Sequence, residues 1–388
     1  MTTDPVRLAR VALAYMFEPG NFDLALELDE RGPVDAVTRV CSGDAAAPLV
    51  EIATQRLAGR DPYDIVAELL ERTERVGARI VTPEDDEWPP QLEDLRRVSR
   101  PGGSRVDRDV FPPLCIWARG GPSLADMARR SVAVVGARAS TPYGNHVATE
   151  LAYGLAERGW CVVSGGAYGI DAQAHRGALT AGGCTVVVLA CGIDRAYPMA
   201  HASLFERVIE DGLLVSEWPP GADPHRHRFL IRNRVIAAMT RGTVVVEASA
   251  RSGARQTAGR AQLLGRPTMA VPGPVTSAMS VGAHQILRGI GARLVTNAAE
   301  VIEEVGQIGD DLAPLVHGRE RDRDRLGPTL NQVLDGVPSR RSAGAETVAA
   351  NAGLSLRIVL RSLPALVELG FVTRDDVGWR LAPTRRAA

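Results

Sequence analysis

The sequence contains no lysine, because all 45 of its lysine-or-arginine positions are arginine. A Walker-type phosphate loop, a lysine Schiff base and a lysine general base are therefore excluded. Any bound anion must be held by arginine, histidine, backbone N–H groups or helix N-termini. Cysteine is scarce as well, and the five cysteines form no CxxC pair. We expect reduced thiols, mostly in apolar strand-like runs, and neither a zinc site nor a disulfide framework.

Long apolar runs and excess charge are also missing. No stretch of about 18 or more apolar residues occurs, and the segment from Met1 to Arg10 is polar and charged. These features predict a cytoplasmic protein without membrane insertion or an export signal. The formal net charge is only -1. A nucleic-acid site would therefore have to be a local basic cluster.

A length of 388 residues suggests two or three domains. Pro-rich and charged segments interrupt the apolar patterns and mark candidate boundaries. The predicted parts are a small helical module (1–80), a linker with a strand leading into the sheet (81–130), a central α/β domain (131–306), a charged linker (307–325) and a winged-helix-like module (326–388). The last module is predicted as three helices and a hairpin. Pro364 falls inside its third helix, where it removes a hydrogen bond and clashes with the Leu360 carbonyl, so we do not expect a straight recognition helix.

The central segment alternates Val-rich apolar runs with amphipathic helical segments. This alternation is typical of a doubly wound, mainly parallel sheet that is covered on both faces. The predicted strands are 132–135, 161–163, 185–189, 213–215, 243–246 and 268–271. In such a sheet, the loops that leave the carboxyl ends of the strands line the ligand crevice. The sequence therefore predicts that function lies in those loops.

Two of these loops are rich in glycine. The first, 136–144, places Arg138 just ahead of a helix N-terminus, where a phosphate would meet the guanidinium and free N–H groups. The second, 164–171, has three glycines that let the backbone approach a ligand closely, and Asp171 can cap the next helix. Ordinary turn chemistry explains the second loop equally well.

The third loop is basic. Residues 224–234 contain four arginines, two histidines and Phe229, a combination suited to the backbone and bases of a single nucleic-acid strand. An exposed, charged helix start is the alternative. His225 and His227 could be metal ligands, but no cysteine or carboxylate has a ligating spacing. A fourth loop, 247–258, opens a helix with two more arginines and faces the same crevice.

Catalytic patterns are missing from these loops. Ser164 is not in a GxSxG turn, no HExxH motif occurs, and the carboxylates of the loops show no evident acid and base pairing. We therefore expect a binding protein without a catalytic site or a metal.

The order and spacing of several short motifs resemble the DNA-processing protein A family, also called Smf. The motifs are Gly136-Ala137-Arg138, Tyr143-Gly144, 164–171, Gly192-Ile193-Asp194, Tyr197-Pro198, Ser216-Glu217, Phe229, Arg232-Asn233-Arg234, Ser252-Gly253, Thr257-Ala258 and 270–273. The resemblance covers most of the chain. It implies an extended Rossmann-like domain and a homodimer that binds single-stranded DNA and delivers it to the RecA recombinase. It implies no enzymatic activity and no cofactor.

By this resemblance and the loop chemistry, ten residues are candidates for holding the strand. They are Gly136, Arg138, Ser164, Gly165, Gly166, Phe229, Arg232, Asn233, Arg234 and Thr257. Two other functions stay open. Nucleoside monophosphate phosphoribohydrolases use a related Rossmann variant, although segment 251–258 lacks the glutamate that their PGGxGTxxE loop carries. The C-terminal module could read duplex DNA through Arg357 and Arg361.

Overall fold

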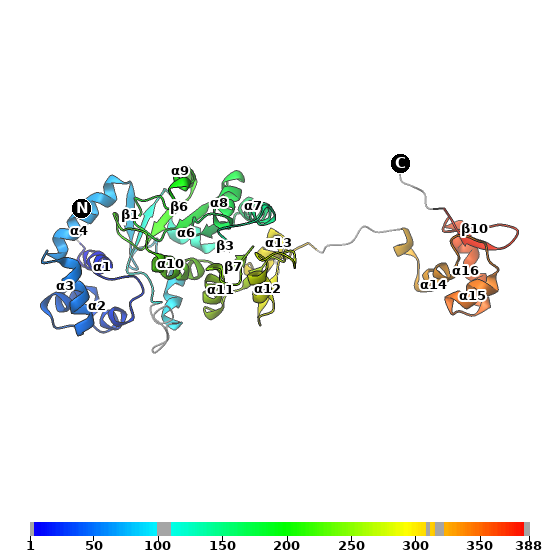
Figure 1. The fold of residues 1–388 in the computed structure, drawn as a ribbon, viewed down its shortest axis with the longest axis horizontal. Coiled ribbons are helices and arrows are strands. Elements are labelled where there is room, and N and C mark those ends of the chain that lie inside the picture. The colour runs from blue at the N-terminus through cyan, green and yellow to red at the C-terminus, as the bar shows by residue number, and fades with distance from the viewer. Residues whose placement is uncertain (1–3, 99–109, 308–310, 315–321, 384–388) are drawn as a thin grey trace. The chain divides into compact units, whose positions relative to one another are not determined.

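A mainly parallel β-sheet organises the first part of the chain (Figure 1). The computed structural model describes residues 4–98, 110–307, 311–314 and 322–383. These residues form two compact units, Met1–Ala313 and Pro314–Ala388. In the described part of the first unit, the strand order is β1-β2-β6-β5-β4-β3-β7-β8-β9. The strands are β1 (Ala78–Val81), β2 (Ile116–Arg119), β3 (Ser131–Val135), β4 (Cys161–Ser164), β5 (Thr185–Val188), β6 (Leu213–Ser216), β7 (Gly242–Val245), β8 (Thr268–Ala270) and β9 (Ala292–Leu294).

All neighbouring strands from β6 to β9 are parallel, whereas β2 pairs antiparallel with both β1 and β6. The six predicted strands of the central segment correspond to β3–β8, and β9 was not predicted. Its sequence, Ala292-Arg293-Leu294, is short and largely exposed, so it carries little of the apolar signal that marks a buried strand. The sheet nevertheless gains a parallel edge there.

Helices cover both faces of the sheet (Figure 1). The helical elements of the first unit are α1 (Pro5–Met16), α2 (Phe22–Ser42), α3 (Ala47–Leu57), α4 (Pro62–Arg75), η1 (Pro90–Arg97), α6 (Leu124–Arg129), α7 (Pro142–Glu157), α8 (Ile170–Thr180), η2 (Met199–His201), α9 (Ala202–Asp211), α10 (Arg226–Met239), α11 (Ala254–Leu263), α12 (Val281–Leu287) and α13 (Ala298–Val305). On β3, Val132 and Val134 join the core formed by α7, α8 and α13. Ala133 and Val135 join the core with α10 and α11. Side chains alternate between the two faces of a strand, so only a continuous apolar run fills both cores.

The N-terminal helices pack onto the antiparallel end of the same sheet. Leu13 of α1 and Leu49 of α3 share one buried cluster with Trp117 of β2 and Phe205 of α9. The Trp117 indole also donates a hydrogen bond of 3.1 Å to Thr73 Oγ1 of α4. The helices predicted over 1–80 are therefore present, and they contribute to the core of the first unit.

The segment from 81 to 130 is more structured than the predicted linker. The Pro-rich sequence prevents a long α-helix, but η1 is a short 3-10 helix that buries Leu92 and Leu95 completely. Their spacing of three residues places both on one face of such a helix. Residues 99–109, which include the predicted breaker 100–103, lie outside the described residues.

The chain reverses its direction across the sheet at β3. Successive strands run outward from β3 to β6, and the chain then crosses through α10 to β7 on the other side of β3. In an open α/β sheet, this switch point leaves a crevice at the carboxyl ends of the two central strands. The topology therefore directs the loops after β3 and β7 toward one site.

The second unit contains η3 (Asp322–Arg325), α14 (Pro328–Gly336), α15 (Ala345–Ala352), α16 (Leu356–Glu368) and the antiparallel pair β10 (Val372–Arg374) and β11 (Trp379–Leu381). Val333, Val359 and Leu363 are fully buried in its core. Helix α16 contains Pro364 inside its bounds, as predicted, and continues beyond it to Glu368. Of the predicted mixed-charge run 319–325, residues 319–321 lie outside the described residues. Throughout the described ranges, no helix has the length and apolar character needed to cross a membrane.

Candidate nucleic-acid interface

A cavity of about 800 Å³ lies at the switch point, where the loops after β3 and β7 meet the first half of α10. Six of the ten predicted site residues line it: Gly136, Arg138, Phe229, Arg232, Asn233 and Thr257. We call this cavity the crevice. Loops far apart in the sequence form its walls because the strand order brings β3 and β7 side by side.

Arg138, Phe229 and Tyr197 form a row of side chains at the crevice. The Arg138 guanidinium lies 4.9 Å from the centre of the Phe229 ring, and the Tyr197 ring lies 5.6 Å from the Phe229 ring at 49°. Arg138 and Tyr197 are exposed and Phe229 is half-buried. The row therefore offers a cation and ring faces of the kind on which nucleic-acid bases stack.

The loop that carries Arg138 is held by partly buried hydrogen bonds. Glu247, which follows β7, accepts the Thr141 hydroxyl at 2.7 Å and the Thr141 backbone N–H at 2.9 Å. The Thr141 side chain in turn caps α7 by accepting the Gly144 N–H at 3.2 Å. Two crevice loops are thus tied to each other, which keeps Arg138 at a defined place.

Arg232 lies beneath the crevice surface and is 4% exposed. Its Nη1 donates to the Val188 carbonyl, and Gly165 packs so closely on the guanidinium that no Cβ would fit there. Burial lowers the pKa of Arg232 to about 10, opposed by the nearby Asp171 carboxylate. The guanidinium therefore stays charged at neutral pH. Burial also raises the pKa of Asp171, although Arg232 and the Ala167 N–H favour its ionised form.

Ser164, Gly165 and Gly166 support the crevice from below and do not line it. The Ser164 hydroxyl donates to the Val134 carbonyl at 2.6 Å and is fully buried. Gly166 has φ +66° and packs against Phe205 and Val187, where a side chain would collide. These residues shape the turn that encloses Arg232.

Arg234 points away from the crevice into a buried ion pair. Its Nη2 donates to Glu217 Oε1 at 2.6 Å, and the two side chains are 1% and 3% exposed. Burial raises the pKa of Glu217, whereas the charge and hydrogen bond of Arg234 lower it. A buried pair of this kind is weak evidence for stability or for ligand contact. The structure thus separates Arg234 from the other predicted site residues.

Side chains outside the ten candidates also line the crevice, and three of them add a phenol ring or a guanidinium. They are Tyr197, Arg226 and Arg251. All three are exposed, and each stands in a motif already recognised. The signal that could have found them is their place just beyond a strand or at a helix start. Within the described residues, the crevice lining contains four arginines and a single carboxylate, Asp171. The crevice is therefore positive in a chain whose net charge is -1.

Carboxylates are scarce in the lining of the crevice. Among the described residues that line it, Asp171 is the only carboxylate, and its burial disfavours a charged, accessible base. No group of three or more potential metal ligands gathers anywhere in the described ranges. The arrangement can hold phosphates and stack aromatic bases.

A Rossmann-like sheet with an arginine- and aromatic-lined crevice at its switch point defines a class of nucleotide- or nucleic-acid-binding proteins. The chain belongs to the DNA recombination-mediator protein A family, whose family model matches residues 79–306. The resemblance seen in the sequence is therefore confirmed, and the protein's role lies in DNA processing.

Individual relatives agree with this membership. A putative DNA processing protein DprA from Mycobacterium tuberculosis is 44% identical over 379 residues, which are 97% of this chain and 95% of the relative. Protein Smf from Escherichia coli is 36% identical over 225 residues, 58% of this chain and 56% of that protein. The X-ray structure of DNA processing protein A from Streptococcus pneumoniae has a TM-score of 0.59 and 28% identity, covering 79% of this chain and 100% of the other. The predicted Rossmann-like fold class is thus confirmed.

Proposed function

We propose that the crevice binds single-stranded DNA and that the protein acts as a non-enzymatic recombination mediator. The observation that supports this proposal most directly is the row formed by Arg138, Phe229 and Tyr197. The Arg138 guanidinium lies 4.9 Å from the Phe229 ring centre, and the Tyr197 ring centre lies 5.6 Å from it. Unpaired bases expose ring faces to such a row, whereas the bases of a duplex are stacked on one another. Stacking is worth about 1–3 kcal/mol per base.

Phosphates would be held by the basic side chains around this row. Arg138, Arg226 and Arg251 are exposed at the crevice, and each can release counterions by contacting one phosphate. Three such contacts on a single strand predict that log K falls with log salt with a slope of about -2. Arg232 adds a fixed positive charge beneath the site and shapes its floor.

We extend the proposal to what the protein does with the bound strand. Membership in the recombination-mediator family supports delivery of the bound strand to the RecA recombinase, in the cytoplasm and as a homodimer. The test is a RecA filament assay on single strands coated with a single-strand-binding protein. Faster filament formation with the protein supports delivery, and an unchanged rate contradicts it.

The test of binding is fluorescence anisotropy with labelled single-stranded and duplex oligonucleotides across a salt series. We expect preference for single strands, and we expect Arg138→Ala to weaken binding and reduce the salt slope by about 0.7, because one phosphate contact is lost. The matched control is Arg75→Ala, which removes an exposed arginine of α4 that does not line the crevice.

Two results would overturn the proposal. Absence of binding at low salt would direct attention to hydrolysis, tested by release of free base from nucleoside monophosphates. Equal effects of Arg138→Ala and Arg75→Ala would show that binding is nonspecific and not located in the crevice.

Duplex reading by the second unit receives less support. The exposed side of α16 carries Leu356 and Leu360, which are 39% and 49% exposed, beside Arg357 and Arg361. Base edges and phosphates in a groove are contacted mainly by polar and charged side chains. The assignment of this unit to the winged-helix class is part of our proposal.

A further inference from the structure

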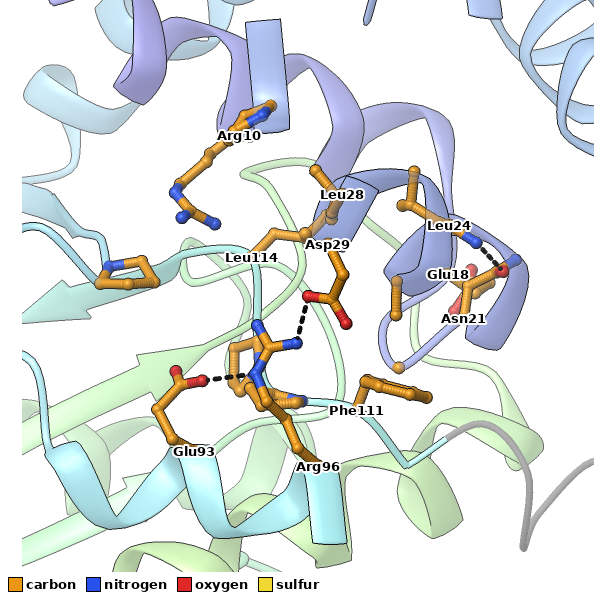
Figure 2. Close-up of a pocket in the computed structure, with 16 residues that line it drawn as sticks. Arg10, Glu18, Asn21, Leu24, Leu28, Asp29, Glu93, Arg96, Phe111 and Leu114 are labelled. Atoms are coloured by element: carbon orange, nitrogen blue, oxygen red, sulfur yellow. Dashed lines mark hydrogen bonds and ion pairs between the residues drawn. The ribbon is translucent and has the colours of Figure 1, made fainter. Parts of the chain in front are cut away.

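Glu18 connects the N-terminal helices to the helix that carries the crevice side chains. It lies in the turn between α1 and α2, at the wall of a cavity of about 150 Å³ that Leu24 and Leu114 also line (Figure 2). Its carboxylate accepts Arg228 Nε at 3.1 Å and 3.2 Å, and also Arg228 Nη2. The Trp218 indole donates to the same carboxylate at 3.0 Å. The contact with Arg228 spans 210 residues of sequence.

Helix α10 begins without the groups that normally stabilise a helix N-terminus. In the described structure, His225 makes no side-chain capping bond, and the first turn contains no acidic residue. The first turn instead holds Arg226 and Arg228, whose positive charges are unfavourable at the positive end of a helix dipole. Glu18 supplies the missing negative charge from another part of the chain.

Arg228 is held firmly in place and links Glu18 to the first turn of α10. Its side chain is 6% exposed, its guanidinium lies 5.4 Å from the Trp218 ring centre, and its Nη1 donates to the Asp223 carbonyl at 2.7 Å. Burial opposes ionisation of Glu18, but the hydrogen bonds from Arg228 and Trp218 lower its pKa. The crevice residue Phe229 follows Arg228 directly in the chain.

We propose that Glu18 is a positioning residue for single-stranded DNA, because it fixes the first turn of α10 and with it the Phe229 ring. His227, which also lines the crevice, lies 3.7 Å from Glu18 through its Nε2. The N-terminal helices thus take part in binding without touching the nucleic acid. The inference rests on the proposed function of the crevice.

Glu18→Gln tests this role with little change in shape. The amide keeps one acceptor but loses the charge that holds Arg228, so Phe229 is no longer held in its stacking position. We expect about a tenfold loss of affinity for single strands, equivalent to part of one stacking interaction. The matched control is Glu84→Gln, because Glu84 also pairs with an arginine, Arg10 of α1, at 2.7 Å. Within the described residues, the Glu84 carboxylate forms its ion pair with α1 and none with α10.

The decisive readout is the fluorescence of a 2-aminopurine base in an oligonucleotide saturated with the full-length protein. Stacking quenches this base, so we expect strong quenching with the parent and with Glu84→Gln, and weak quenching with Glu18→Gln and with Phe229→Ala. Melting temperatures are measured alongside. If Glu18→Gln only destabilised the protein, the saturated variant would quench the 2-aminopurine fluorescence as fully as the parent does. Full quenching by Glu18→Gln would therefore overturn the inference.

Failure of the two proposals can be told apart. A parent protein that does not bind single strands refutes the proposed function of the crevice. A parent that binds and quenches, together with a Glu18→Gln variant that behaves identically, refutes the positioning role and leaves the proposed function standing.

Discussion

Gly165 and Arg232 form a tightly packed contact at the floor of the crevice. Gly165 has no side chain, and the Arg232 guanidinium occupies the space that a Cβ would need. Arg232 cannot withdraw easily, because it is 4% exposed and its Nη1 is bonded to the Val188 carbonyl. A glycine in a routine-looking turn is therefore required for steric reasons that its own loop does not reveal.

Gly165→Ala should destabilise the protein by about 1–3 kcal/mol, the usual cost of overpacking, and should weaken single-strand binding by displacing Arg232. Urea unfolding and anisotropy measure the two effects. Gly259→Ala is the control, because Gly259 lies inside α11 with open space where the added methyl group would stand and alanine stabilises a helix interior by about 0.5–1 kcal/mol. Equal stability of Gly165→Ala and the parent would contradict the packing argument.

His175 is a buried group whose protonation state follows from its neighbours. The Thr185 hydroxyl donates to the Val162 carbonyl at 2.6 Å, so the His175 ring must donate from Nδ1 to Thr185 Oγ1 at 2.8 Å. Its Nε2 then carries no proton and has no partner among the described residues. Burial, together with the positive charges of His201, Arg232 and Arg176, lowers the pKa of His175 to about 3.

This shift predicts a loss of stability in acid. Between the unfolded pKa of about 6.5 and the folded value of about 3, the unfolded chain binds a proton that the folded chain does not. The free energy of unfolding therefore falls as pH decreases, by about 1.4 kcal/mol per unit from this residue. Between pH 7 and pH 5, we expect the free energy of unfolding of His175→Gln to fall by about 2 kcal/mol less than that of the parent. Urea unfolding at the two pH values measures this difference. Parallel pH profiles would contradict the assignment.

At the scale of single elements, α16 shows a conflict between local and tertiary preferences. Pro364 removes one backbone hydrogen bond inside the helix, yet the helix continues from Leu356 to Glu368. Leu363 and Leu366 on either side are fully buried, and their burial outweighs the local cost. Proline in a helix interior costs about 3 kcal/mol relative to alanine.

Pro364→Ala should therefore stabilise α16 by about 1–3 kcal/mol. The side chain is exposed, so the substitution leaves the core unchanged. Hydrogen exchange of the amides of α16 in the full-length chain measures the effect, because exchange from a helix reports its opening free energy. Slower exchange is expected. Unchanged or faster exchange would mean that the proline already fits this helix without cost.

Helix α10 shows how one basic segment divides into different roles. Arg226 is exposed at the crevice, Arg228 pairs with Glu18, Arg232 lies under the crevice floor and Arg234 pairs with Glu217. A helix turns about 100° per residue, so four arginines within nine positions must face different surroundings. Only some of them can meet a ligand.

At the scale of the whole molecule, the crevice belongs entirely to the first unit. All residues that line it fall between Val135 and Met279. A chain ending at Ala313, the boundary between the compact units, should therefore bind single strands within about twofold of the full-length affinity, a difference of only about 0.4 kcal/mol. Anisotropy at one fixed salt concentration measures this. A loss of ten times or more would show that the second unit takes part in single-strand binding.

The sequence by itself determined the class of fold and predicted at which edge of the sheet a ligand site should lie. A continuous apolar run such as 132–135 places apolar side chains on both faces of its strand. Such a strand belongs in a sheet that is covered on both faces. The absence of lysine left arginine as the main anion-binding side chain, and the loops after these runs had to meet at the carboxyl edge. These conclusions depend on local composition and spacing, which the chain carries without reference to distant contacts.

Tertiary structure alone decided which basic residues face the crevice and what holds them. Nothing near Arg234 in the sequence indicates that it pairs with buried Glu217, and nothing near Arg228 indicates Glu18, 210 residues away. The same holds for η1, whose leucines became core residues only because the sheet lies against them. The physical reason is that burial and charge pairing depend on which surfaces meet, and contacts between distant segments of the chain determine those surfaces.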